Sequence, residues 1–161
     1  MTKMTSDKSK FNLFISYYHV DRYFKDKLND IIGDHYNTTS SPHKYEICHN
    51  HQKYTEELQK TPSENNIFIV LVGNETYKSK NVDWEINYGL HEHACMLGLC
   101  LPTNDDYLKT NINPKLIPEK LANNIFSGYA SYFDWTENVN DLENYIDFSL
   151  KNMFKKHALL V

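Results

Sequence analysis

The chain has 161 residues, of which 40% are hydrophobic and 14% aromatic, so it is long enough for one packed core and too apolar for a disordered protein. Its formal net charge of −4 and its scattered lysines argue against nucleic-acid binding, which needs clustered basic residues. Three cysteines without a CxxC pair argue against a disulfide framework.

The first part of the chain predicts a strand followed by a helix. Residues 1–9 are polar and predict a flexible tail, which leaves residues 10–161 as a single domain. Residues 11–18 (FNLFISYY) are apolar and aromatic and predict a strand buried on both faces. In residues 22–36 the apolar side chains recur at helical spacing, and Asp21 precedes them as a candidate helix cap.

The middle of the chain predicts a second buried strand between two polar regions. Residues 37–51 are rich in turn-forming residues, with a short strand at 45–48, and residues 52–60 predict a short helix. Residues 66–72 (NIFIVLV) are the clearest strand. After a polar loop, residues 82–97 (VDWEINYGLHEHACML) repeat apolar positions at helical spacing and predict a helix.

The remaining elements complete an alternating pattern. Residues 97–102 (LGLCLP) predict a strand, residues 103–124 predict irregular chain with a helical turn near 119–122, residues 127–135 (SGYASYFDW) predict an edge strand, and residues 138–156 predict an amphipathic helix. Strands that alternate with helices favour parallel βαβ crossovers. The expected fold is therefore α/β, an open, mostly parallel sheet of flavodoxin-like order with helices on both faces.

Two groups of polar and aromatic residues lie at or after the ends of predicted strands, at the edge where ligands of such sheets bind. The first group is Ser16, Tyr17, Tyr18, His19 and Asp21. It offers hydroxyls, an imidazole and a carboxylate as candidate ligand contacts. The alternative is ordinary structure, with Tyr17 in the core and Asp21 as a helix cap.

The second group is the pair Trp84 and Glu85, one turn into the helix that follows the clearest strand. Glu85 is either a surface acid that compensates the helix dipole or the centre of an active site. Trp84 could stack on a planar ring and shield the acid from water. Both interpretations of Glu85 remain open at this point.

Metal and nucleotide motifs are not found in the sequence. Residues 48–51 (CHNH) and 91–95 (HEHAC) contain candidate ligands, but no paired second motif has a recognised spacing, so no metal site is expected. The chain has no GxGxxG, GxxxxGK[ST] or GxSxG motif. A dinucleotide, if one binds, is therefore not held in the Rossmann manner.

The sequence also predicts a protein without membrane segments. No apolar run approaches the roughly 20 residues of a membrane-spanning helix. The polar start MTKMTSDKSK has no apolar core of a signal peptide. We therefore expect a cytoplasmic protein.

Two blocks of the sequence resemble a known family. Residues 12–21 (NLFISYYHVD) and 66–86 (NIFIVLVGNETYKSKNVDWEI) resemble the TIR-like domains of ThsB proteins, from the Thoeris systems of bacterial anti-phage defence. The second block is the more specific: a hydrophobic strand, a glycine, a Thr–aromatic pair, a basic stretch and an aromatic–Glu pair at a helix start. Residues 37–51 replace the BB-loop signature of animal TIR domains.

The resemblance implies a flavodoxin-like TIR fold and an enzyme of the NAD glycohydrolase or ADP-ribosyl cyclase type. NAD would be the substrate, with no cofactor. The product would be an ADP-ribose-derived signal, cyclic (such as cyclic ADP-ribose) or conjugated, that activates a partner effector. A phage protein is the expected trigger, and a homo-oligomer is expected as well.

The resemblance also implies residue roles. It assigns catalysis to Glu85 and the lining of the nucleotide pocket to the segment from Ser16 to Asp21. The main alternative is a non-catalytic scaffold of the same fold that recognises a phage protein or a nucleotide. A third interpretation is a flavodoxin-like nucleotide-binding protein unrelated to defence.

Overall fold

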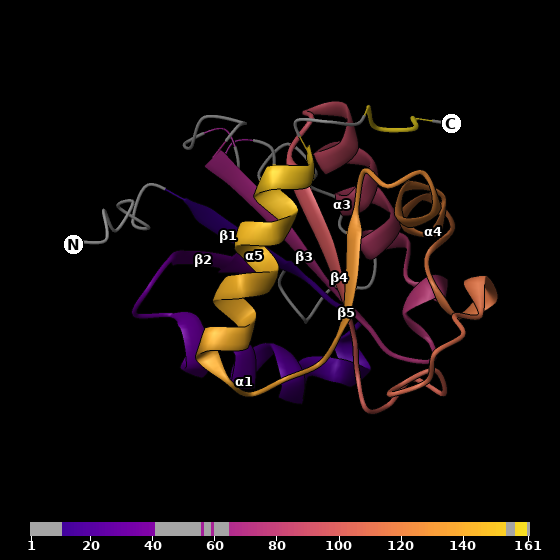
Figure 1. The fold of residues 1–161 in the computed structure, drawn as a ribbon, viewed down its shortest axis with the longest axis horizontal. Helices are drawn as coiled ribbons and strands as arrows, with labels where there is room; N and C mark the ends of the chain where they lie inside the picture. The colour runs from indigo at the N-terminus through magenta and orange to yellow at the C-terminus, as the bar shows by residue number, and fades with distance from the viewer. Residues whose placement is uncertain (1–10, 41–55, 57–58, 60–64, 154–156, 161) are drawn as a thin grey trace.

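The chain folds around one five-stranded parallel sheet with the strand order β2-β1-β3-β4-β5 (Figure 1). The computed structural model describes residues 11–40, 56, 59, 65–153 and 157–160. The strands are β1 (Asn12–Ser16), β2 (Asn37–Ser40), β3 (Asn66–Val72), β4 (Cys95–Cys100) and β5 (Ser131–Asp134). All four pairings are parallel, and the order is that of flavodoxin-like folds. The predicted fold class is confirmed.

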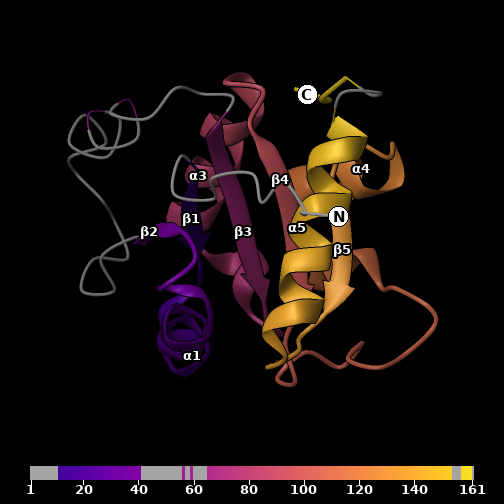
Figure 2. The same ribbon diagram turned by 60° about the vertical axis from the view of Figure 1, so that its left-hand side comes forward.

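Helices cover both faces of the sheet. In the described part of the chain the α-helices are α1 (Arg22–Ile32), α3 (Lys80–His91), α4 (Glu119–Phe126) and α5 (Val139–Met153), and the 3-10 turns are η2 (His19–Asp21), η4 (Thr76–Lys78) and η5 (Pro114–Leu116). Helices α1 and α5 lie on one face, and α3 and α4 lie on the other (Figures 1 and 2).

The two faces of the sheet carry two separate layers of core. Leu13 and Ile15 pack in the layer that contains side chains of α1 and α5, whereas Phe14 packs in the layer of α3 and α4. Successive side chains of a strand point to opposite faces. The central strands must therefore be apolar at nearly every position, which explains why β3 (Asn66–Val72) was recognised with its observed bounds.

The predicted helix over residues 82–97 is partly wrong. Helix α3 starts at Lys80 and ends at His91, and Cys95 and Met96 belong to β4. The chain turns at His93, which adopts a left-handed conformation with φ of 56°. Cys95 and Met96 fitted the helical period, but they lie fully inside the sheet. Short apolar runs allow either assignment by periodicity alone.

Strand β2 was also missed. Asn37–Ser40 was assigned to a turn-rich region because all four side chains are polar. The segment pairs in parallel with β1, and Thr39 Oγ1 donates a hydrogen bond to Asn12 Oδ1 at 3.0 Å. A strand at the edge of a sheet needs no continuous apolar run.

Other expectations agree in part. The helical turn expected near 119–122 is the first half of α4, and the expected edge strand contains β5. The final helix is α5, Val139–Met153. The expected tail (1–9), the strand at 45–48 and most of the helix at 52–60 lie outside the described residues.

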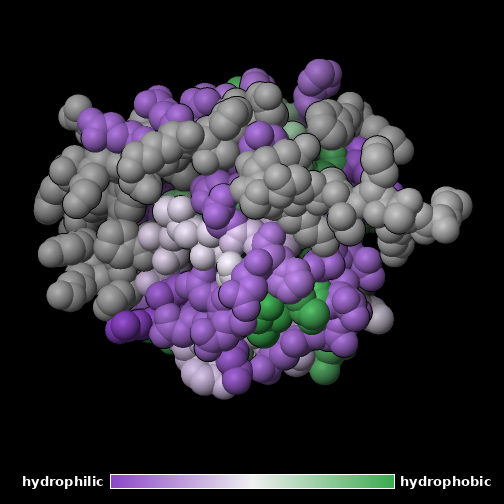
Figure 3. All heavy atoms as spheres, turned by 90° about the vertical axis from the view of Figure 1, so that its left-hand side faces the viewer, coloured by the Kyte–Doolittle hydropathy of each residue, from purple (hydrophilic) through white to green (hydrophobic). Residues whose placement is uncertain are grey.

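None of the described helices is both long and apolar enough to cross a bilayer. On the face shown in Figure 3, the coloured residues are mostly hydrophilic and surround a small hydrophobic area.

Candidate active site

The carboxylate of Glu85 is buried. Helix α3 begins after Ser79, whose Oγ accepts a hydrogen bond from the Val82 amide at 3.2 Å. A side-chain cap of this kind fixes where a helix starts, and it places Glu85 in the second turn. Glu85 is only 1% exposed. It is therefore not a surface charge that compensates the helix dipole.

The last residue of β1 contacts this carboxylate. Ser16 Oγ donates a hydrogen bond to Glu85 Oε1 at 2.9 Å, although the two residues are 69 positions apart. Ser16 alternates onto the same face of the sheet as Phe14, which is the face that α3 covers. Because a buried carboxylate is costly unless it accepts hydrogen bonds, this bond holds Glu85 against the end of β1.

This contact lies at the point where the strand order reverses. Strand β1 pairs with β2 on one side and with β3 on the other, and Ser16 is in register with Val70 of β3. Open α/β sheets bind ligands outside the carboxyl ends of the strands at this reversal. The geometry thus brings two of the predicted site residues, Ser16 and Glu85, to the expected location.

Tyr17 points to the opposite face of the sheet from Ser16. It packs in the core layer of α1 and α5, and the Lys25 Nζ lies 5.6 Å from its ring centre. Burial is the main cause that raises the pKa of Tyr17 to about 12, while Arg22 lowers it and the nearby carboxylates, Glu85 included, add to the increase. Tyr17 is therefore a protonated core residue at neutral pH, as in the structural alternative for this position.

Tyr18 and His19 lie at the outer rim of the site. Tyr18 is half-buried and His19 is exposed at the start of η2. Their ring centres are 4.4 Å apart, with the rings inclined at 57°. The structure thus places these two side chains on the surface of the rim and Glu85 in its interior.

Asp21 does not cap α1, contrary to the structural alternative. It occupies the position before the helix, but its side chain makes no capping hydrogen bond. Instead, Asp21 is 2% exposed and its Oδ1 accepts a hydrogen bond from Thr103 Oγ1 at 3.1 Å. The carboxylate lies where a side chain on Gly73 would have to be, so that glycine allows the close approach.

The second oxygen of Asp21, Oδ2, is buried without a hydrogen bond to the described residues. Burial is the largest cause that raises the pKa of this carboxyl above its ordinary value of 3.8; the Thr103 hydrogen bond lowers it, and Glu75 raises it further. Through its hydrogen bond with Thr103 and its close approach to Gly73, Asp21 links the ends of β1, β3 and β4 at the rim of the sheet.

Trp84 packs along the helix. It is half-buried, and its ring stacks on Tyr88 with centres 5.5 Å apart and planes inclined at 20°. Tyr88 in turn lies near Phe68, at 6.5 Å between ring centres. Consecutive helical residues are separated by roughly 100° around the axis. Trp84 thus projects from a different side of α3 than Glu85, which contacts β1.

Several polar residues that hold the rim together were not singled out from the sequence. The Gly73 amide donates to Thr76 Oγ1 at 2.8 Å, and Asn104 Nδ2 donates to the Gly73 carbonyl at 3.2 Å. Thr103 contacts Asp21 as described above. These residues follow β3 and β4 directly, and that position at the carboxyl ends of strands was the signal that could have identified them.

The candidate metal ligands at residues 91–95 do not lie on one helix, because His91 ends α3 and Cys95 starts β4. Cys95 is buried on β4, and burial raises the pKa of its thiol to about 12. Among residues that the structure describes, no three His, Cys, Asp or Glu side chains gather as a metal site would require. The motif at residues 48–51 lies outside them.

Comparison with known protein families shows which family the chain matches. The family model described as "Thoeris protein ThsB, TIR-like domain" matches residues 14–106, more than half of the chain. The matched segment contains Ser16, Asp21, Trp84 and Glu85. No curated protein matches the chain.

Proposed function

The chain belongs to the family of TIR-like domains of the Thoeris protein ThsB, and from this premise we propose that it is an NAD-consuming enzyme of bacterial anti-phage defence. It cleaves the bond between nicotinamide and ribose and releases an ADP-ribose-derived signal, cyclic or conjugated. The signal activates a partner effector protein. A phage protein is the proposed trigger, and the enzyme works in the cytoplasm.

One observation carries this proposal: a buried carboxylate that is oriented by a serine at the ligand-binding edge of the sheet. Glu85 is 1% exposed, and Ser16 donates to it at 2.9 Å. A carboxylate in a water-poor site interacts far more strongly with a developing positive charge than one in bulk water. This arrangement suits a reaction that passes through a sugar cation.

The chemistry needs such a group. The bond from ribose C1′ to the nicotinamide nitrogen breaks, and its electron pair leaves with nicotinamide, which departs as a neutral molecule. The ribose carries the positive charge in an oxocarbenium-like transition state, as in glycoside hydrolysis. Glu85 stabilises this charge. Water or a hydroxyl then adds to C1′ and loses its proton, which gives the linear or a conjugated product. Alternatively, an adenine ring nitrogen adds to C1′ and the exocyclic amino group releases the proton, which gives the cyclic product.

The other residues have supporting roles in this proposal. Ser16 orients Glu85 through its hydrogen bond. Tyr18 and His19 on the outer rim contact the ring systems of NAD, whereas Trp84 supports α3 by stacking on Tyr88. Asp21 fixes the loops around the site, and Tyr17 supports β1 from the opposite face.

The low exposure of Glu85 also bears on regulation. At 1% exposure the carboxylate reaches a ribose only after neighbouring side chains move. We propose that the infection trigger, directly or through self-association, promotes this opening. The resting protein is then expected to turn over NAD slowly.

The test is incubation of the purified full chain with NAD, with and without lysate from phage-infected cells. Nicotinamide release is followed by chromatography, and the second product is identified by mass spectrometry. The proposal predicts nicotinamide and an ADP-ribose-derived product, with faster release in infected lysate than in uninfected lysate. Absence of release with every phage lysate tested would favour the non-catalytic scaffold instead.

A further inference from the structure

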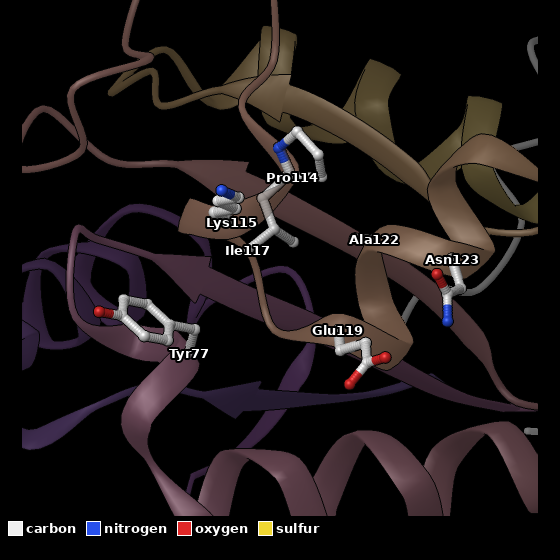
Figure 4. A pocket seen from close by; sticks show the side chains of 7 residues that line it. All are labelled: Tyr77, Pro114, Lys115, Ile117, Glu119, Ala122 and Asn123. Atoms are coloured by element: carbon white, nitrogen blue, oxygen red, sulfur yellow. The ribbon is translucent and has the colours of Figure 1, made fainter.

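A hollow lies between η4 and α4, and none of the residues that line it is among the predicted site residues (Figure 4). It is an open pocket of about 430 Å³. The residues that line it are Tyr77, Pro114, Lys115, Ile117, Glu119, Ala122 and Asn123. All of these except Tyr77 follow residue 106, where the family match ends. Membership of the family therefore assigns no role to this pocket.

The wall opposite Tyr77 is held in place by hydrogen bonds. Asn113 Oδ1 accepts from the Lys115 amide at 3.1 Å and caps η5. The Asn113 amide donates to Asp106 Oδ2 at 2.6 Å, and the Asp106 amide donates to Asn104 Oδ1 at 2.8 Å. A chain of hydrogen bonds thus connects this wall to the rim of the sheet and holds η5 in place.

The surfaces inside the pocket suit a planar ring. Ile117 and Ala122 are buried residues that form its apolar base, and Pro114 adds to it. Tyr77 is 47% exposed and supplies an aromatic side wall. Aromatic walls over an apolar base are typical of sites for flat ligands, and pockets of about 300–1,000 Å³ accommodate small molecules.

Three polar groups surround these surfaces. Lys115 is an exposed cation at the η5 end, while Glu119 and Asn123 project from α4 one turn apart (Figure 4). The spacing of four residues puts Glu119 and Asn123 on one side of the helix. The Glu119 carboxylate can accept from an amino group, and the Asn123 amide can donate to a ring nitrogen. A lysine ammonium binds phosphate.

We propose that this pocket is a binding site for a purine nucleotide such as AMP, separate from the site at Glu85. The ring lies against Tyr77 over the apolar base, its polar edge faces Asn123 and Glu119, and its phosphate contacts Lys115. This inference goes beyond the proposed function, because it requires neither NAD cleavage nor Glu85.

The test is isothermal titration calorimetry of the full chain with AMP, adenosine and ribose 5-phosphate. An open site of this size predicts an AMP dissociation constant between about 10 µM and 1 mM. Adenosine, without the anion, and ribose 5-phosphate, without the ring, should each bind about tenfold more weakly or worse. Equal binding of AMP and ribose 5-phosphate would overturn the proposal, as would no AMP binding at millimolar concentration.

Substitutions in the pocket test whether AMP binds there. Tyr77→Ala and Lys115→Glu should each weaken AMP binding about tenfold or more. Lys109→Glu, an exposed lysine with the same charge change in the same region, should leave it unchanged. Tyr77 and Lys115 are both exposed, so thermal unfolding should confirm intact folding. AMP binding that survives both variants, or that Lys109→Glu weakens equally, contradicts the proposal.

Glu85→Gln separates this inference from the proposed function. The variant should retain AMP binding even if it no longer turns over NAD. If Glu85→Gln alone abolished AMP binding, AMP would occupy the site at Glu85, and its assignment to the pocket between η4 and α4 would be wrong.

Discussion

The hydrogen bond between Ser16 and Glu85 is the central contact of the candidate site. Ser16 was identified from the sequence because it lies at the end of a well-marked strand, and Glu85 because it lies near the start of the helix that follows another. Their contact was not predictable, because it depends on which face of β1 carries Ser16. A shift of one residue in the strand would have placed Tyr17 beside Glu85 and Ser16 in the other core layer.

Ser16→Ala should slow nicotinamide release by about 10- to 100-fold. A hydrogen bond to a charged group contributes about 1.5–3 kcal/mol, and each 1.4 kcal/mol corresponds to about tenfold in rate. The measurement is the rate of nicotinamide release at saturating NAD. The control is Ser149→Ala, which removes another buried serine hydroxyl, bonded to the Tyr145 carbonyl on α5.

Ser149→Ala should affect stability without slowing the reaction. Equal rates for Ser16→Ala and the wild type would show that Ser16 does not position the carboxylate.

Asp21 predicts a pH dependence of stability. Burial is the main cause that raises the pKa of this carboxyl above 3.8, so the folded protein retains the proton at pH values where the unfolded chain has lost it. In that window the folded state binds more protons, and stability falls as the pH rises. Asp21→Asn removes the titrating group. The variant should therefore gain stability relative to the wild type as the pH rises from about 4 toward 7.

This difference is measured by urea unfolding at several pH values, with Asp30→Asn as the control for loss of an exposed aspartate. A difference that stays constant with pH, or that changes in favour of the wild type, would mean that burial of Asp21 does not control its titration. The inward orientation of Asp21 was not predictable from local sequence, because its partner Thr103 is 82 residues away.

The strands and helices could be predicted where the periodicity was unambiguous. Strand β3 was predicted with its observed bounds because it is buried on both faces. Strand β2 was missed because an edge strand with four polar side chains has no hydrophobic signal. The start of β4 was assigned to a helix because Cys95 and Met96 fit a helical repeat as well as a strand.

The segment at residues 157–160 is held by a side chain that no sequence pattern indicates. Asn124 on α4 is fully buried. Its Nδ2 donates to the Leu159 carbonyl at 3.0 Å and to the Lys120 carbonyl at 2.8 Å, and its Oδ1 accepts from the Leu159 amide at 2.7 Å. One amide thus attaches a distant segment to α4.

Asn124→Ala should release this segment. The Leu159 amide should lose its protection against hydrogen exchange, and the free energy of unfolding should fall by about 1–3 kcal/mol because buried polar groups lose their partners. Asn123→Ala, which truncates the exposed neighbour, is the matched control and should change neither quantity by as much. Protection of Leu159 that persists in Asn124→Ala would contradict the assigned role of this side chain.

The molecule as a whole combines a parallel sheet with polar side chains along one edge. Helices cover both faces, so the edge at the carboxyl ends of the strands is where polar side chains of several elements meet. The fold class could be predicted from the alternation of strands and helices, and the candidate site was predicted at this edge from the same alternation. The loop contacts could not, because they join segments far apart in sequence.

The most direct test compares Glu85→Gln with Asp83→Asn in protein incubated with NAD and lysate from phage-infected cells. Both variants replace an acid of α3 by its amide, but Glu85 is buried against Ser16 whereas Asp83 is exposed. The measured quantity is the rate of nicotinamide release from NAD, with thermal unfolding as the check on folding. Glu85→Gln should lose at least about a hundredfold in rate, since removal of one preorganised electrostatic group typically costs 10²–10³, and Asp83→Asn should lose little. Full turnover by a folded Glu85→Gln protein would contradict the assignment of Glu85 as the catalytic carboxylate.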